Sequence, residues 1–232
     1  MTTENLNKNG ANEPVTCTWD TNSECDVCPI HRALDCKWER KHLIRFYLNG
    51  LPFFIPTAIG MILTIIWTGN WTGFIIYAAF WMFFFGFFEI YVLCRHCPYY
   101  SEEGRILHCL ANHGLLKIWK YNPGTMNRWE KAGLLIGLIL FLGIPVVTFI
   151  FGTLTLYEAE TGIFFVIILS GITFLTFGGT LIFGKNLVTK ICPHCVNFSC
   201  PLNRVPKEVR DAYLKRNPVM KQAWEKTGYR LG

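Results

Sequence analysis

Four long apolar blocks dominate the sequence, and each is long enough to cross a lipid bilayer as a helix. They cover residues 46–67, 71–93, 132–156 and 162–183. A helix needs about 20 apolar residues to span the hydrocarbon layer. The chain is 51% hydrophobic and 16% charged, whereas ordinary soluble domains carry about 25% charged residues. We therefore predict an all-α membrane protein with four transmembrane helices, arranged as two antiparallel hairpins.

Cysteine-rich segments precede, separate and follow the two predicted hairpins. Each contains a Cys-x-x-Cys pair and a third cysteine, and the second and third also share an Asn-Pro, Met and Trp-Glu-Lys succession. This similarity predicts a parallel internal repeat, with the two hairpins related by an axis along the membrane normal. The predicted divisions are a disordered N-terminus (1–16), cysteine unit 1 (17–45), hairpin 1 (46–93), cysteine unit 2 (94–131), hairpin 2 (132–184) and cysteine unit 3 with the C-terminal tail (185–232).

Basic residues place all three cysteine units on one side of the membrane. All 22 Lys and Arg residues lie in the N-terminal segment, the middle loop with its flanks or the C-terminal tail. The turns at 68–70 and 157–161 contain none. Because short basic loops stay in the cytoplasm during insertion, we predict a multi-pass cell-membrane protein with both termini and all ten cysteines in the cytoplasm.

Tryptophan side chains favour the headgroup layer, where an amphipathic ring has one wet and one apolar side. The repeated Trp-Glu-Lys is interpreted as a helix start or an interfacial anchor, without a catalytic role. The expected anchors are Trp67, Trp71, Trp129 and Trp224.

The cysteine units have the spacing of thiolate metal sites. A Cys-x-x-Cys turn directs two sulfurs at one point, and further ligands complete a tetrahedral site. Disulfides are rare in the cytoplasm, so clustered cysteines there bind metals or carry out redox chemistry. One or two of the ten could be packing residues, but three grouped triads exceed what packing explains. The predicted ligands are Cys25, Cys28 and Cys36 in unit 1, Cys94, Cys97 and Cys109 in unit 2, and Cys192, Cys195 and Cys200 in unit 3.

Three other residues could complete these sites. Cys17 has no counterpart in units 2 and 3, so it is either the fourth ligand of the first site or a bystander. His108 and His194 each directly precede a cysteine, and imidazole is a common metal ligand, although hydrogen bonding is the simpler role for either. Units 2 and 3 both follow hairpin ends closely, so we expect them to be neighbours, sharing one site or holding two.

The cysteine spacing does not distinguish an iron–sulfur cluster from zinc, since both use paired Cys-x-x-Cys turns. Cys-Pro occurs at Cys28, Cys97 and Cys200, and ferredoxin-type runs end in Cys-Pro, which favours a cluster. The compact ferredoxin run does not occur in the sequence, however, and the Cys192–Cys195 loop looks equally like a zinc knuckle.

In architecture, the layout resembles the polytopic subunits of anaerobic electron-transfer complexes, which combine four helices with cytoplasmic Cys-Pro motifs. Those proteins carry Cys-x3-Cys-Pro or complete ferredoxin quartets, and neither occurs in this sequence. The resemblance therefore covers the arrangement of the chain and assigns no residue a role.

Glu89 is the only acidic or basic side chain well inside an apolar block. A carboxyl group there is costly to charge and marks a functional candidate. It lies about one helical turn from Cys94, so we expect it to reach the interface or to pair with Arg95 or Lys131. No histidine occurs in the four blocks, which argues against a haem held between two intramembrane histidines.

Three functions fit these features. The first is iron–sulfur electron transfer between a soluble protein and a membrane partner or quinone. The second is a zinc-bound structural cap that docks a protein partner on the lipid membrane. The third is a thiol–disulfide oxidoreductase, although such pairs usually face the oxidising side. Nucleic acid is not an expected partner, because the basic residues flank the membrane and no nucleic-acid motif accompanies them.

Overall fold

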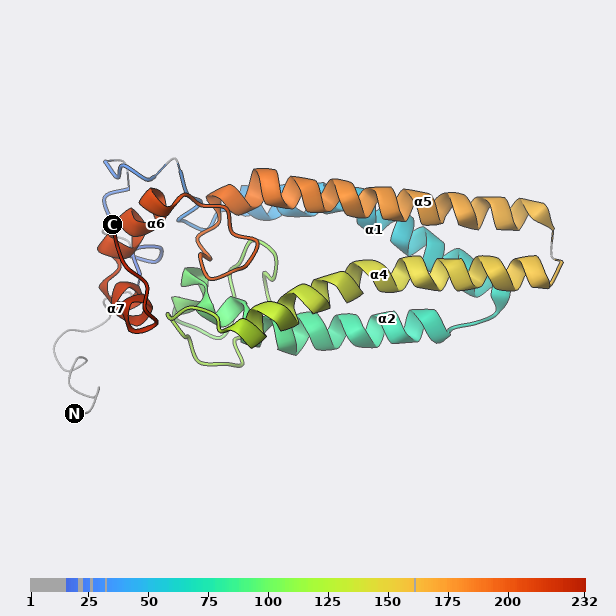
Figure 1. Ribbon diagram of the computed structural model, residues 1–232, viewed down its shortest axis with the longest axis horizontal. Helices are drawn as coiled ribbons and strands as arrows, with labels where there is room; N and C mark the ends of the chain where they lie inside the picture. Colours follow the sequence, from blue (N-terminus) through green and yellow to red (C-terminus); the bar gives the residue numbers. More distant parts are fainter. Residues whose placement is uncertain (1–15, 21–22, 26, 32, 161) are drawn as a thin grey trace.

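Four long helices run side by side in an elongated bundle, and a folded cap lies at one end of it (Figure 1). The computed structural model describes residues 16–20, 23–25, 27–31, 33–160 and 162–232. The predicted disordered segment 1–16 lies outside these residues, except for Thr16. In the described part of the chain, helices are the regular structure, and the only β-type pairing is an isolated bridge between Ile106 and Leu116. The predicted all-α class is confirmed.

Each apolar block forms a helix that is long and apolar enough to cross a membrane, as predicted. The first and third are continuous, whereas the second and fourth contain a five-residue π-helical turn near the cap. The spans are α1 (Arg40–Thr68), α2 (Thr72–Phe83) continued by the π-helical Phe84–Phe88 and α3 (Glu89–Val92), α4 (Arg128–Glu158), and α5 (Ile163–Asn186) continued by the π-helical Leu187–Ile191; the cap adds α6 (Lys207–Arg216) and α7 (Pro218–Lys226).

Local sequence sets the ends of the membrane helices. At the end of α1, Gly69 adopts a left-handed conformation (φ 68°) and its N–H bonds to the carbonyl oxygen of Ile65, a conformation that glycine adopts without steric cost. At the start of α4, the Asn127 side chain accepts from the N–H of Glu130 at 2.9 Å, while the Glu130 carboxylate accepts from the N–H of Asn127 at 2.7 Å. This reciprocal cap makes the Trp-Glu-Lys at Trp129 a helix start, which is one of the two roles that the sequence predicted.

Helix α4 is the central helix of the bundle, because it contacts α1, α5 and the combined α2–α3 helix. In contrast, α1 packs chiefly against α5, and few contacts join α1 to α2 although a short turn connects them. Figure 1 shows the same arrangement, with α5 beside α1 and α4 beside α2. The bundle is therefore held mainly by helices that are distant in sequence, rather than by contact within the first predicted hairpin.

Glycines permit the closest helix approaches. A Cβ atom at Gly137 of α4 would overlap the ring of Phe84 in the π-helical turn. One at Gly179 of α5 would overlap the backbone of Pro52 in α1. Small residues of this kind let helices pack tightly in lipid, where dispersion contacts replace the hydrophobic effect between helices.

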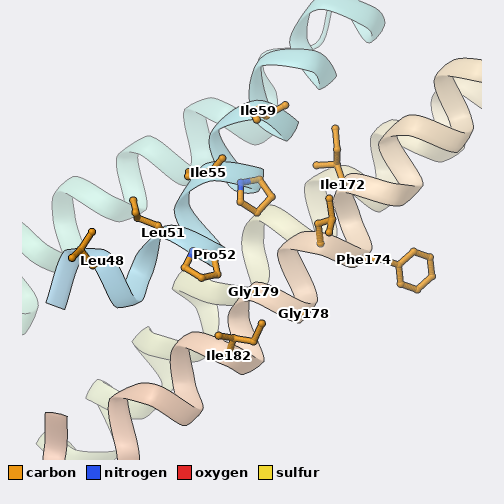
Figure 2. Close-up of a pocket in the computed structure, with 12 residues that line it drawn as sticks. Leu48, Leu51, Pro52, Ile55, Ile59, Ile172, Phe174, Gly178, Gly179 and Ile182 are labelled. Atoms are coloured by element: carbon orange, nitrogen blue, oxygen red, sulfur yellow. The ribbon is translucent and has the colours of Figure 1, made fainter. Parts of the chain in front are cut away.

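A groove of about 650 Å³ runs along the bundle surface between α1 and α5 (Figure 2). Proline, glycine and apolar side chains line it, among them Leu51, Ile55, Ile172 and Ile182. It lies within two membrane spans, so hydrocarbon chains match its chemistry. Its lining has no polar side chain that could orient a quinone ring, since ligand pockets fix orientation through a few placed polar groups.

The tryptophans separate into surface and buried positions. Trp129 is 84% exposed and Trp71 is 56% exposed, which fits their predicted place at the headgroup layer. Trp224 is only 4% exposed and lies in the core of the cap, so its prediction as an interfacial anchor is wrong. The reason is that this Trp-Glu-Lys ends the short helix α7, which packs into the cap core.

We predict that Gly179→Ala destabilises the bundle and that Gly178→Ala does not. The added methyl group at position 179 meets the backbone of Pro52, which cannot move aside, whereas at position 178 it meets no atom within 4 Å. Overpacking typically costs about 1–3 kcal/mol. Unfolding in mixed detergent micelles, followed by circular dichroism, measures this difference; equal stability of the two variants contradicts the close α1–α5 approach.

Candidate metal centres in the cap

The three cysteine units fold into one cap with its own hydrophobic core. Buried Leu34 of unit 1, Tyr99 of unit 2 and Phe198 of unit 3 belong to a single cluster, together with Tyr213 of α6 and Trp224 of α7. Small cysteine-rich segments rarely bury enough apolar surface to fold alone. Here three such segments share one core, and this brings their cysteines into the same small volume. Cysteines in or against this core are Cys17, Cys28, Cys36 and Cys97.

The two Cys-x-x-Cys pairs at the ends of membrane helices have the same backbone shape. Each begins with a three-residue 3₁₀ turn, at Cys94–His96 and at Cys192–His194. The second cysteine then turns to extended backbone, with φ −85° and ψ 137° at Cys97 and φ −78° and ψ 127° at Cys195. Each pair therefore presents two thiols from one tight turn, at the point where a helix leaves the membrane.

Thiols of units 2 and 3 form one group. Burial raises the pKa of Cys97, and the charges of Cys109 and Cys195 raise it further. Burial likewise raises the pKa of Cys195 to about 12, with contributions from Cys200 and Cys109. Hydrogen bonds join the two units: the Asn197 amide donates at 3.1 Å to the carbonyl oxygen of Leu93, directly before Cys94, and the Met126 N–H donates at 2.5 Å to the Ser199 oxygen, so the units are neighbours in space. The group contains Cys94, Cys97, Cys109, Cys192, Cys195 and Cys200.

Thiols of unit 1 form a second group. Burial raises the pKa of Cys36 to about 12, and the charges of Cys17, Cys28 and Cys25 add to this effect. Asn217 fixes Cys17 in place: its side-chain oxygen accepts from the Cys17 N–H at 2.7 Å, and its amide nitrogen donates to the Cys17 sulfur at 3.3 Å. Cys17 therefore lies with the other three thiols of unit 1.

Backbone N–H groups donate to four of the six sulfurs in the first group. They lower the pKa of these four thiols and so oppose the effect of burial. Hydrogen bonds of this kind stabilise thiolates and tune thiolate-bound metals. In four cases the donor lies two residues after the cysteine: Tyr99 for Cys97, Ala111 for Cys109, Asn197 for Cys195 and Leu202 for Cys200.

Among the described residues, no three Cys, His, Asp or Glu side chains converge closely enough to hold a single metal ion. A tetrahedral zinc site draws its sulfurs to about 2.3 Å from one ion. The predicted ligands are thus grouped, but they are spaced more widely than the ligands of one ion.

The two candidate histidines are hydrogen-bonded through one ring nitrogen. Nδ1 of His194 lies 3.1 Å from the carbonyl oxygen of Ala33, and Nδ1 of His108 lies 2.5 Å from the carboxylate of Glu102. Metal-bound histidines use their second nitrogen for bonds of this kind. The contacts therefore suit either a plain hydrogen-bonding role or a ligand role through Nε2.

Glu89 is buried, with 6% of its surface exposed, rather than reaching the interface. Its carboxylate accepts a hydrogen bond from the side chain of Asn112 at 2.7 Å, and the same amide group lies 3.3 Å from the Cys94 sulfur. The expected partner Arg95 pairs instead with Glu130 at 2.5 Å. The predicted pairing with Arg95 or Lys131 is therefore wrong. Asn112, in the loop after Cys109, folds back over the helix end and donates the hydrogen bond to the Glu89 carboxylate instead.

Sequence reasoning missed the polar residues that position the thiols. Asn112 is distant from Glu89 in sequence, and no pattern marks it. Asn217 is part of the repeated Asn-Pro motif, so the repeat was a signal that could have identified it.

Comparison with known proteins identifies no relative. No protein-family model, curated protein or solved structure matches this chain. The chemistry of the cap therefore carries the functional interpretation.

We predict that Asn112→Ala destabilises the cap, because it leaves the buried Glu89 carboxyl without its donor. An unsatisfied buried group costs about 1–3 kcal/mol. Asn49→Ala, which removes an exposed bond to the Arg45 carbonyl oxygen, is the control. Chemical unfolding of both variants tests this, and in a double-mutant cycle Glu89→Gln with Asn112→Ala is expected to be less than additive. Full additivity contradicts the contact.

Proposed function

We propose that this multi-pass membrane protein holds two thiolate-ligated metal centres in its cap and transfers electrons between a soluble protein and a membrane-embedded partner. The observation that carries the proposal is the packing of units 2 and 3 against each other, where the Asn197 amide donates to the Leu93 carbonyl oxygen at 3.1 Å and the Ser199 oxygen accepts from the Met126 N–H at 2.5 Å. Six buried or half-buried thiols lie on these two units. The four thiols of unit 1 would form the other centre.

The sequence favours an iron–sulfur cluster over a single zinc ion, because Cys-Pro, which ends ferredoxin-type runs, recurs in all three cysteine units. When bound, the cluster supplies a one-electron carrier whose potential depends on burial and on hydrogen bonds to its sulfurs. The chain offers both.

Residues between the two thiol groups support a relay from one centre to the other. The charge of Asp35 raises the pKa of Cys36 in unit 1 and of Cys195 in unit 3, so it lies near both. The Tyr99 hydroxyl donates to the carbonyl oxygen of Asp35, and the Asp35 N–H donates to the carbonyl oxygen of His194 at 2.8 Å. These contacts hold Asp35 of unit 1 against the Cys192–His194 turn of unit 3.

A zinc cap is the second candidate, since a shared core built from three short segments is what a structural metal would stabilise. The thiol–disulfide function fits less well. A reactive thiol needs a lowered pKa, whereas burial raises the pKa of Cys36, Cys195 and Cys200 to about 12. The proposed location of the cap is the cytoplasm, on the charge asymmetry of the loops.

We predict that Cys97→Ala and Cys36→Ala each remove a different part of the bound metal. Anaerobically purified protein is analysed for iron, acid-labile sulfide and zinc. Each single variant is expected to lose one centre and retain the other, and the double variant to lose both. Iron with sulfide supports electron transfer, while zinc alone supports the structural cap. Unchanged metal content in both variants contradicts the two thiol groups as ligands.

A further inference from the structure

A second, polar pocket lies in the cap. Its volume is about 350 Å³, and it is lined by the loop before α4, the first turn of α4, the segment after Cys195, α6, α7 and the C-terminal tail. None of the proposed thiol ligands lines it. It is therefore separate from the candidate metal centres.

Two cations, Lys131 and Arg210, line this pocket, and no acidic residue does. Within the described part of the chain, neither cation takes part in a direct ion pair. Arg210 is held in place by Tyr229, whose hydroxyl oxygen accepts from its Nε at 2.9 Å and whose ring lies 5.1 Å from the guanidinium carbon. The same hydroxyl donates at 2.6 Å to the carboxylate of Asp211, which is buried outside the pocket lining.

A hydroxyl donor adds to the two charges. Ser199 also lines the pocket, and its oxygen accepts from the Met126 N–H at 2.5 Å, so its hydroxyl hydrogen remains available to donate.

We propose that this pocket binds a phosphate group. Two cations and a hydroxyl group form a set made of donors, which suits an anion with several acceptor oxygens. Arginine binds phosphate oxygens with its planar fork, and lysine binds them as a point charge. The volume of the pocket accommodates one such group.

The position of the pocket at the membrane edge gives the phosphate two sources. Lys131 lies in the first turn of α4, beside the exposed Trp129 that marks the headgroup layer. Basic pockets at this depth bind the headgroups of anionic lipids. A free phosphate or a phosphorylated solute presents the same chemistry, and the experiment below separates the two.

The test uses the full chain purified in an uncharged, phosphate-free detergent. Inorganic phosphate is titrated at constant ionic strength, and the shift in melting temperature gives its dissociation constant. In parallel, nanodiscs of uncharged galactolipid with a small fraction of phosphatidylglycerol are prepared, and the lipid that remains with the protein after detergent exchange is measured by mass spectrometry.

Two variants remove one ligand group each: Lys131→Gln and Arg210→Gln. Arg128→Gln and Lys226→Gln remove equal charge from exposed positions on α4 and α7 and serve as controls. The losses of Lys131 and Arg210 are each expected to weaken binding about tenfold or more, and the controls are expected to change it little. Because Arg210 also packs against Tyr229, Lys131→Gln decides the outcome if Arg210→Gln misfolds.

Selective retention of phosphatidylglycerol, lost in Lys131→Gln but not in Arg128→Gln, establishes a lipid headgroup site. Binding of inorganic phosphate without retained lipid establishes a site for a soluble phosphate. The proposal is overturned if neither probe binds, or if the control variants weaken binding as much as the pocket variants.

Discussion

The position of α4 between two other membrane helices determines where the chemistry of this protein lies. It contacts both α5 and the combined α2–α3 helix, and each of these ends in a Cys-x-x-Cys turn. The close approach of Gly137 to Phe84 fixes one of these contacts. Because helices are rigid over their length, the bundle places both turns at one end of the molecule and keeps them together. Units 2 and 3 are thereby held next to each other.

The cap depends on that arrangement in turn. Unit 1 contacts the unit 3 turn through Asp35 and His194, and through Cys17 it contacts Asn217, the residue between α6 and α7. The result is a single core in which burial raises the pKa of the thiols while backbone N–H groups lower it. Thiols in this balance are suited to releasing their protons when a metal binds, because the cation then replaces the solvation that burial removes.

Much of the fold could be predicted from the sequence, because apolar length and cysteine spacing are local signals. The four spans follow from the apolar blocks, and the start of α4 follows from Asn127 and Glu130 within the repeat. The pairing of α1 with α5 could not be predicted, since it depends on small residues such as Gly179 meeting a specific turn of another helix. The burial of Trp224 and the bond from Asn112 to Glu89 also join distant segments. The Trp-Glu-Lys motif begins the long helix α4 and ends the short helix α7. The motif alone therefore did not predict whether its tryptophan is exposed or buried.

The most direct measurement is the visible absorbance and electron paramagnetic resonance spectrum of anaerobically purified protein before and after reduction by dithionite. Thiolate-bound iron–sulfur centres predict a brown protein whose absorbance bleaches on reduction and whose reduced form is paramagnetic. If the two centres form a relay, one electron donor is expected to reduce both of them, and the spectra of both centres change together. A colourless protein that contains only zinc and gives no signal on reduction would contradict electron transfer by this cap.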